Sequence, residues 1–91
     1  MNKYIATFYS HFGAVRFSRE LKAHAVTVRL GPVPRFLSSS CGTCAEFDYA
    51  DDPDDLKDGS LIGMLSHPDE IEQLILIRPD GSWEAVNGLN A

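Results

Sequence analysis

Short segments with strand-like patterns recur along this chain, and they limit its fold more than any other feature does. Residues 26–30 show the pattern most clearly, because apolar side chains alternate there with the polar Thr27 and Arg29. Alternation with a period of two is typical of a strand with one buried face. Related patterns predict five strands in all, at residues 4–9, 26–30, 45–49, 71–77 and 83–86.

One segment follows a helical period instead. Between residues 12 and 24, apolar side chains recur at helical spacing on one face: Ala14, Phe17 and Leu21. Ser10 precedes this segment and is a suitable N-cap, because a serine hydroxyl accepts a hydrogen bond from the first helical turn. A second, shorter helix is predicted at residues 56–65, although Gly59 and Gly63 lower its helical propensity.

The order of these segments predicts an α+β fold. A chain of 91 residues supports one domain, residues 1–91, with a single core. The order favours a ferredoxin-like or split β-α-β sandwich, in which a mostly antiparallel sheet has one long and one short helix on one face. The last two strands are predicted to form a hairpin, because Pro79-Asp80-Gly81 between them is a favourable turn sequence.

Composition excludes several classes of protein. The formal net charge of −5 argues against a general nucleic-acid binder, which needs clustered excess lysine and arginine to neutralise phosphates. No apolar run approaches the roughly 18–20 residues that span a bilayer, and residues 1–9 lack the apolar region and cleavage site of a signal peptide. We therefore expect a protein of the reducing cytoplasm with no membrane partner. Its two cysteines are too few for a disulfide-rich scaffold.

The charge is distributed unevenly along the chain. Residues 1–45 contain six basic residues and one acidic residue, whereas residues 46–91 contain twelve acidic residues and two basic ones. Six of the acids fall within residues 48–58, and such a run is most often a solvated loop. A calcium loop beginning at Asp54 is excluded, because Leu56 and Leu65 would occupy positions that need oxygen ligands. Both cysteines lie in the basic half, so we expect positive surroundings for them.

The segment from Arg35 to Cys44 is the one that could carry chemistry. A cysteine acts as a nucleophile through its thiolate, so a reactive thiol needs neighbours that lower its pKa. The small side chains around Cys41 would let several backbone N–H groups face one anion, and the Arg35 guanidinium could add positive charge. Gly42 permits the close approach of a substrate or partner. The candidates for catalysis are Cys41 and Cys44, and those for substrate binding are Arg35, Ser38, Ser39, Ser40 and Gly42.

The CxxC motif at residues 41–44 is compatible with four roles. In dithiol redox proteins the second thiol resolves a mixed disulfide, but their motif usually opens a helix, and a strand is predicted here. A zinc site would need two further ligands, and no ligand-like spacing is found among the histidines of the chain, which are His11, His24 and His67. Both cysteines could instead be small buried residues. The fourth role is a carrier thiol, which holds sulfur or selenium and passes it on.

Several short strings give the chain a resemblance to a known family. They are Tyr4-Ile5-Ala6-Thr7-Phe8-Tyr9-Ser10-His11, Gly13-Ala14, Pro32-Val33-Pro34-Arg35 and Leu37-Ser38-Ser39-Ser40-Cys41-Gly42. Over residues 4–49 the sequence resembles the selenium/sulfur carrier-like family of small bacterial proteins. The resemblance implies an α+β domain related to sulfur-carrier folds, with Cys41 as the carrying residue in a loop shaped by Arg35, Ser40 and Gly42. Cys44 stands where other members often have an apolar residue, so a resolving or protecting role stays open.

We therefore expect a carrier rather than an enzyme. Its Cys41 thiolate would take a sulfane sulfur or selenium atom from a donor protein and release it to an acceptor protein, without a cofactor or a metal. Cys44 could release the product by forming an intramolecular disulfide. The alternatives are a dithiol-disulfide redox protein and a binding or adaptor module with a structural or metal-linked CxxC. The open edge of the C-terminal hairpin also allows a homodimer.

Overall fold

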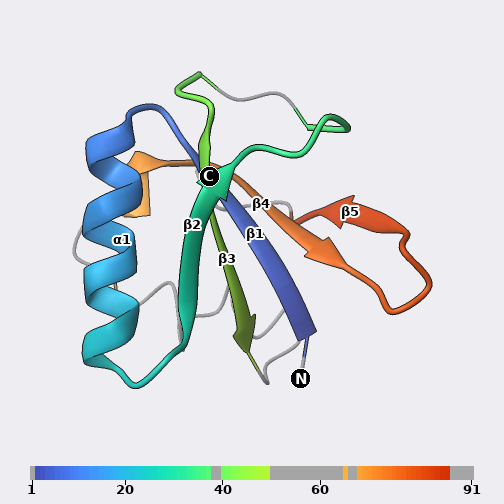
Figure 1. The fold of residues 1–91 in the computed structure, drawn as a ribbon, viewed down its shortest axis with the longest axis horizontal. Helices are drawn as coiled ribbons and strands as arrows, with labels where there is room; N and C mark the ends of the chain where they lie inside the picture. The colour runs from blue at the N-terminus through green and yellow to red at the C-terminus, as the bar shows by residue number, and fades with distance from the viewer. Residues whose placement is uncertain (1, 38–39, 50–64, 66–67, 87–91) are drawn as a thin grey trace.

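The computed structural model describes residues 2–37, 40–49, 65 and 68–86. These residues form one five-stranded sheet with the strand order β2-β3-β1-β4-β5 (Figure 1). The strands are β1 (Asn2–Phe8), β2 (Val28–Pro32), β3 (Thr43–Tyr49), β4 (Ile71–Ile77) and β5 (Trp83–Ala85). Helix α1 (His11–Ala23) connects β1 to β2, and a short 3-10 helix, η2 (Pro68–Glu70), precedes β4.

All neighbouring strands of the sheet are antiparallel. Because β3 lies between β1 and β2 and opposes both, β1 and β2 are parallel to each other, with α1 as the connection between them. β4 and β5 add a hairpin on the other side of β1. In the turn of that hairpin, Gly81 has a φ of 89° and the Arg78 N–H donates to the Ser82 carbonyl at 2.8 Å. The α+β class, the antiparallel sheet and the C-terminal hairpin are thus confirmed.

Local sequence sets both ends of α1. At the start, the Ser10 hydroxyl accepts a hydrogen bond from the Gly13 N–H at 3.2 Å, which confirms Ser10 as the N-cap. At the end, the Val26 N–H donates to the Leu21 carbonyl and Ala25 has a φ of 63°. This left-handed residue after the helix is typical of a Schellman motif, a position that glycine normally occupies. Among the described residues, no helix is long and apolar enough to cross a membrane.

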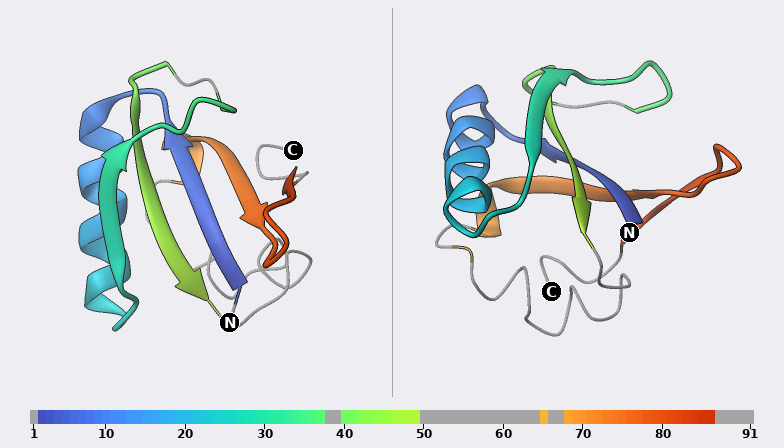
Figure 2. Two further views of the ribbon diagram at one scale, coloured as in Figure 1. Left: turned by 45° about the vertical axis from the view of Figure 1, so that its right-hand side comes forward. Right: turned by 60° about the horizontal axis from the view of Figure 1, so that its bottom comes forward.

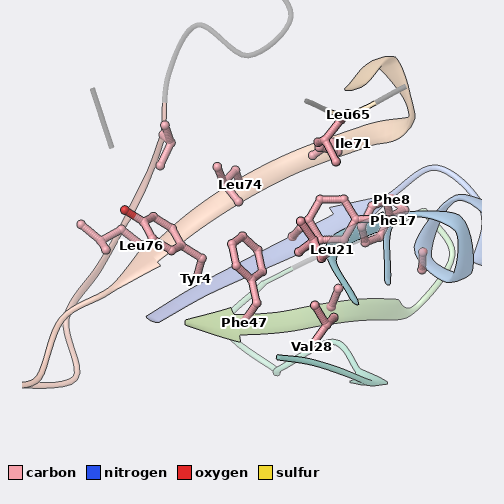
Figure 3. Packing of buried hydrophobic residues seen from close by; sticks show 14 residues of the cluster. Tyr4, Phe8, Phe17, Leu21, Val28, Phe47, Leu65, Ile71, Leu74 and Leu76 are labelled. Atoms are coloured by element: carbon pink, nitrogen blue, oxygen red, sulfur yellow. The ribbon is translucent and has the colours of Figure 1, made fainter. Parts of the chain in front are cut away.

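The main core lies between α1 and one face of the sheet, which we call the helix side (Figure 2). Phe47 is at its centre, with ring centroids 5.4 Å from Tyr4 and 5.5 Å from Phe17 (Figure 3). Phe8 adds a third ring contact, 5.2 Å from Phe17. Leu65 also packs in this cluster. Stacked and tilted rings at these separations contribute beyond the area that they bury, so these contacts hold α1 to β1 and β3.

The other face of the sheet, which we call the open side, has a smaller apolar cluster. Ile5, Cys44 and Ile75 are buried there, on β1, β3 and β4. Val33 and Leu37, from the loop that follows β2, pack against them. Part of the connection between β2 and β3 therefore lies over the face that α1 leaves uncovered.

Two predicted elements need correction. The described residues contain one α-helix rather than two. The predicted short helix at residues 56–65 lies outside the described residues except for Leu65, which is not helical. In addition, β3 begins at Thr43, two residues earlier than predicted, because β2 continues through Gly31 and Pro32 and pairs with Cys44 and Thr43. Proline is tolerated at this position because β2 is an edge strand.

Candidate functional site

The candidate segment is the long loop between β2 and β3. Its ends are joined by a hydrogen bond from the Val33 N–H to the Gly42 carbonyl at 3.1 Å, just beyond the last paired residues of the ladder. Gly42 has a φ of 75°, and no atom of the described residues lies within 4 Å of the position that a Cβ would take there. Glycine is therefore suited to this position by its backbone conformation.

Cys41 lies immediately before this glycine and is half-buried. Its thiol donates a hydrogen bond to the Thr43 carbonyl, with Sγ 3.5 Å from the oxygen. One side of Cys41 packs against the helix-side core. Cys41 is thus partly exposed to solvent, which is one of the properties of reactive cysteines.

Ser40 connects the loop to β4 in the C-terminal half of the chain. Its N–H and its hydroxyl donate to the two carboxylate oxygens of Glu72 on β4, at 3.1 and 2.6 Å. Sequence analysis predicted that backbone N–H groups of this loop would face an external anion, and the Ser40 N–H instead faces a carboxylate of the protein itself. This contact places a carboxylate beside the residue that precedes Cys41.

An aromatic contact holds the outer part of the loop. The rings of Phe36 and Trp83, on β5, have centroids 5.4 Å apart, and both side chains are largely exposed. Arg35 is exposed beside Phe36, and no contact between its guanidinium and Cys41 is found among the described residues. Ser38 and Ser39 lie outside the described residues. Of the predicted substrate-binding residues, the structure therefore places Ser40 and Gly42 next to Cys41.

A histidine from the start of α1 reaches the same end of the sheet. His11 Nδ1 lies 3.2 Å from Thr43 Oγ1, within hydrogen-bonding distance. The start of α1 and the turn before β3 accordingly lie at one end of the fold (Figure 1). Sequence analysis had assigned no role to His11, and no local pattern could have linked it to Thr43, because 32 positions separate them. The tertiary structure thus places the start of α1 next to the CxxC motif, although the last two residues of the motif begin the strand β3 and not a helix.

Cys44 has very different surroundings. It is 5% exposed, and it pairs with Thr7 of β1 on one side and with Gly31 of β2 on the other. Its thiol donates to the Pro32 carbonyl, with Sγ 3.5 Å from the oxygen. Burial raises the pKa of Cys44, and the negative charges of Glu46 and of an ionised Cys41 raise it further. The Cys44 thiol is therefore harder to ionise than an exposed cysteine thiol.

The two sulfurs belong to opposite faces of the sheet. Cys41 packs on the helix side, whereas Cys44 belongs to the open-side cluster, and both are free thiols. The described residues contain no group of three or more histidine, cysteine or acidic side chains that could hold a metal ion. Within that part of the chain, a zinc site built on the CxxC motif has no support.

Ion pairs on the open side and near the helix start join the basic and acidic parts of the sequence. Glu46 lies 3.2 Å from Lys3 Nζ and 2.6 Å from Arg29. Burial alone would raise the pKa of Glu46, but hydrogen bonds and charges from the two cations outweigh it and lower the pKa. A second pair joins Arg16 of α1 to Glu70 of η2 at 3.4 Å. These pairs join residues within β3 and α1 to their neighbours, and none of them includes a residue of the loop that carries Cys41.

Comparison with known proteins adds one positive finding. The family model described as "Putative Se/S carrier protein-like" matches residues 3–58. Neither the curated proteins nor the solved structures yield a significant match. The matched region covers α1, β2, β3 and all of β1 but Asn2, and it includes Cys41 and the candidate loop. Glu72 and Trp83, which contact that loop, lie outside it.

Proposed function

Because this chain belongs to the selenium/sulfur carrier-like family, we propose that it holds a sulfane sulfur or selenium atom on Cys41 and passes it between proteins. The observation that supports this most directly is the contrast between its two thiols. Cys41 is half-buried in a loop, next to the turn at Gly42, whereas Cys44 is buried within the sheet. A carrier needs one accessible thiol and no general-base machinery, and only Cys41 meets this requirement among the described residues.

Loading follows the chemistry of thiol–disulfide exchange. The Cys41 thiolate attacks the outer sulfur of a persulfide on the donor protein. The sulfur–sulfur bond of the donor breaks, the donor leaves as a thiolate, and the transferred atom is bonded to Cys41 Sγ. The step needs no oxidant or reductant, because the transferred atom keeps its oxidation state. Selenium in the outer position follows the same course.

The start of α1 lies at the end of the sheet that carries the Cys41 loop, because His11 Nδ1 is 3.2 Å from Thr43 Oγ1. Partner proteins would act in the reducing cytoplasm, where both thiols stay reduced between cycles.

The test is to load the reduced protein with inorganic polysulfide, a sulfane sulfur source, and to measure its intact mass. We expect the wild-type chain and Cys44→Ala to gain the mass of one sulfur atom, and Cys41→Ala to gain none. The two variants are matched, because each removes one thiol and leaves the other. The proposal would be overturned if the added sulfur were found on Cys44 alone, or if neither cysteine took up sulfur. Either result would favour a binding or adaptor module.

A further inference from the structure

The two thiols offer two ways for a carried sulfur to leave Cys41, and the structure favours one of them. In the first, the Cys44 thiolate attacks Cys41 Sγ, a Cys41–Cys44 disulfide forms, and the outer sulfur leaves as hydrosulfide. In the second, a thiolate from another molecule attacks the outer sulfur. The bond to Cys41 Sγ then breaks, the new sulfur–sulfur bond lies on the acceptor, and the electron pair returns to Cys41 as thiolate.

We propose that Cys44 is not a resolving thiol and that the carried atom leaves only by transfer to a thiol on an acceptor. This inference rests on the proposed function of Cys41. It assigns the next reaction to a class, thiol-to-thiol transfer of a sulfane sulfur, in which the product is a persulfide on the acceptor and free sulfide is not released.

The first argument comes from the alternation of side chains along β3. Ala45 and Phe47 face the helix-side core, so Cys44 and Glu46 face the open side. Cys41 packs on the helix side. A disulfide needs the two Cβ atoms to lie about 3.5–4.5 Å apart and to point toward each other. Cys44 faces the open side, whereas Cys41, in the loop before β3, packs against the helix-side core. The two side chains thus contact opposite faces of the sheet, and this arrangement disfavours a disulfide between them.

The second argument is that the backbone of Cys44 is held from both sides. It pairs with Thr7 on β1 and with Gly31 on β2, so β3 is an interior strand at this position. Turning the Cys44 side chain toward the helix side would shift the register by one residue and would drag Phe47 out of the core. Such a shift would also break the ring contacts of Phe47 with Tyr4 and Phe17.

The third argument concerns the environment of the Cys44 sulfur. Its neighbours in the open-side cluster are aliphatic, namely Ile5 and Ile75, with Val33 and Leu37 of the loop above. Burial there raises the pKa of Cys44, and the thiolate is the form that attacks a disulfide or persulfide. The nearest ionised side chain on the same face of β3 is Glu46, which opposes a second negative charge.

The experiment compares wild-type protein with Cys44→Ala after both are loaded with polysulfide and freed of excess reagent. Without an added thiol, we expect the two proteins to lose sulfide equally slowly. With a cysteine-containing peptide added as acceptor, we expect both to return to their unloaded mass, while alkylation and mass analysis find a persulfide on the peptide. Faster sulfide release by the wild-type protein, ending in a Cys41–Cys44 disulfide, would overturn the proposal.

A second arm separates this inference from the proposed function, because it uses unloaded protein. Reduced wild-type protein is treated with a thiol-specific oxidant, either folded or in denaturant, and the remaining thiols are counted by alkylation. We expect the intramolecular disulfide in denaturant only. Its rapid formation in the folded protein would refute the geometry, even if Cys41 carries sulfur. Failure of Cys41 to take up sulfur, with no folded-state disulfide, would refute only the carrier function.

Discussion

Replacing Thr7 by valine should make this protein more stable, although it removes a polar group from the centre of the sheet. Thr7 is fully buried, and its Oγ1 has no hydrogen-bond partner among the described residues. It lies between Cys44 of β3 and Gln73 of β4 in the register. A buried hydroxyl without a partner costs about 1–3 kcal/mol, and valine keeps the β-branched shape that suits a strand.

The expected size of the effect follows from these terms. Removing the unpaired hydroxyl recovers part of its desolvation cost, and the methyl group that replaces it adds at most about 0.8 kcal/mol of apolar burial. We expect Thr7→Val to raise the free energy of unfolding by about 1–2 kcal/mol. For a domain of this size, each kcal/mol corresponds to roughly 4–8 °C in Tm, which thermal and urea unfolding both resolve.

The matched control is Thr7→Ser, which keeps the hydroxyl and removes the methyl group. We expect it to lower the free energy of unfolding by about 1 kcal/mol. If Thr7→Val were instead less stable than the wild-type protein, the hydroxyl would have a partner in solution, such as a buried water or the Cys44 thiol. The argument from the unsatisfied group would then be refuted.

Three further predictions concern single positions. Ala25→Gly should raise the free energy of unfolding by about 1 kcal/mol, measured by urea unfolding, because Ala25 has a φ of 63° at the end of α1. Gly42→Ala should lower it by about 1–2 kcal/mol for the same reason, since Gly42 has a φ of 75°, and Gly42→Asn should cost less than Gly42→Ala. Because the pKa of Cys44 is raised in the folded state, the thiol ionises at a lower pH in the unfolded chain than in the folded one. The free energy of unfolding should therefore be unaffected by Cys44 at neutral pH and should fall as the pH rises above about 8.5. That fall should be smaller in Cys44→Ala when unfolding is measured across this pH range, and an unchanged fall would contradict the raised pKa of Cys44.

Local features of the fold could be predicted because each depends on neighbouring residues. Ser10 caps α1 as expected, since the cap bond joins residues three positions apart. The helical stripe that contains Phe17 is buried as its spacing indicated. β4 has the predicted bounds, Ile71–Ile77, and the turn that follows it uses Gly81 in the conformation that glycine favours. The sequence analysis placed the start of β3 two residues too late, because the first two residues of this strand, Thr43 and Cys44, pair with Pro32 and Gly31 of β2.

The candidate site could be predicted only in part. The sequence alone indicated Cys41 and Gly42, since a cysteine next to glycine in a run of small residues is visible without any fold. The contact of Ser40 with Glu72 and that of His11 with Thr43 each join residues 32 positions apart. No periodicity or spacing encodes such contacts, because they depend on which strands become neighbours in the sheet.

The amino-acid sequence by itself predicted the helix between the first two strands, the C-terminal hairpin, and a candidate thiol next to a glycine. Each of these follows from the propensities and spacing of nearby residues. Only the tertiary structure decided that Cys41 and Cys44 lie on opposite faces of the sheet. For Cys44 the reason is physical: the face of a strand residue depends on register, and register depends on pairing with β1 and β2, so a shift of one residue would reverse every side chain of β3. Cys41 is in the loop before β3, and its position depends on how that loop packs against the core.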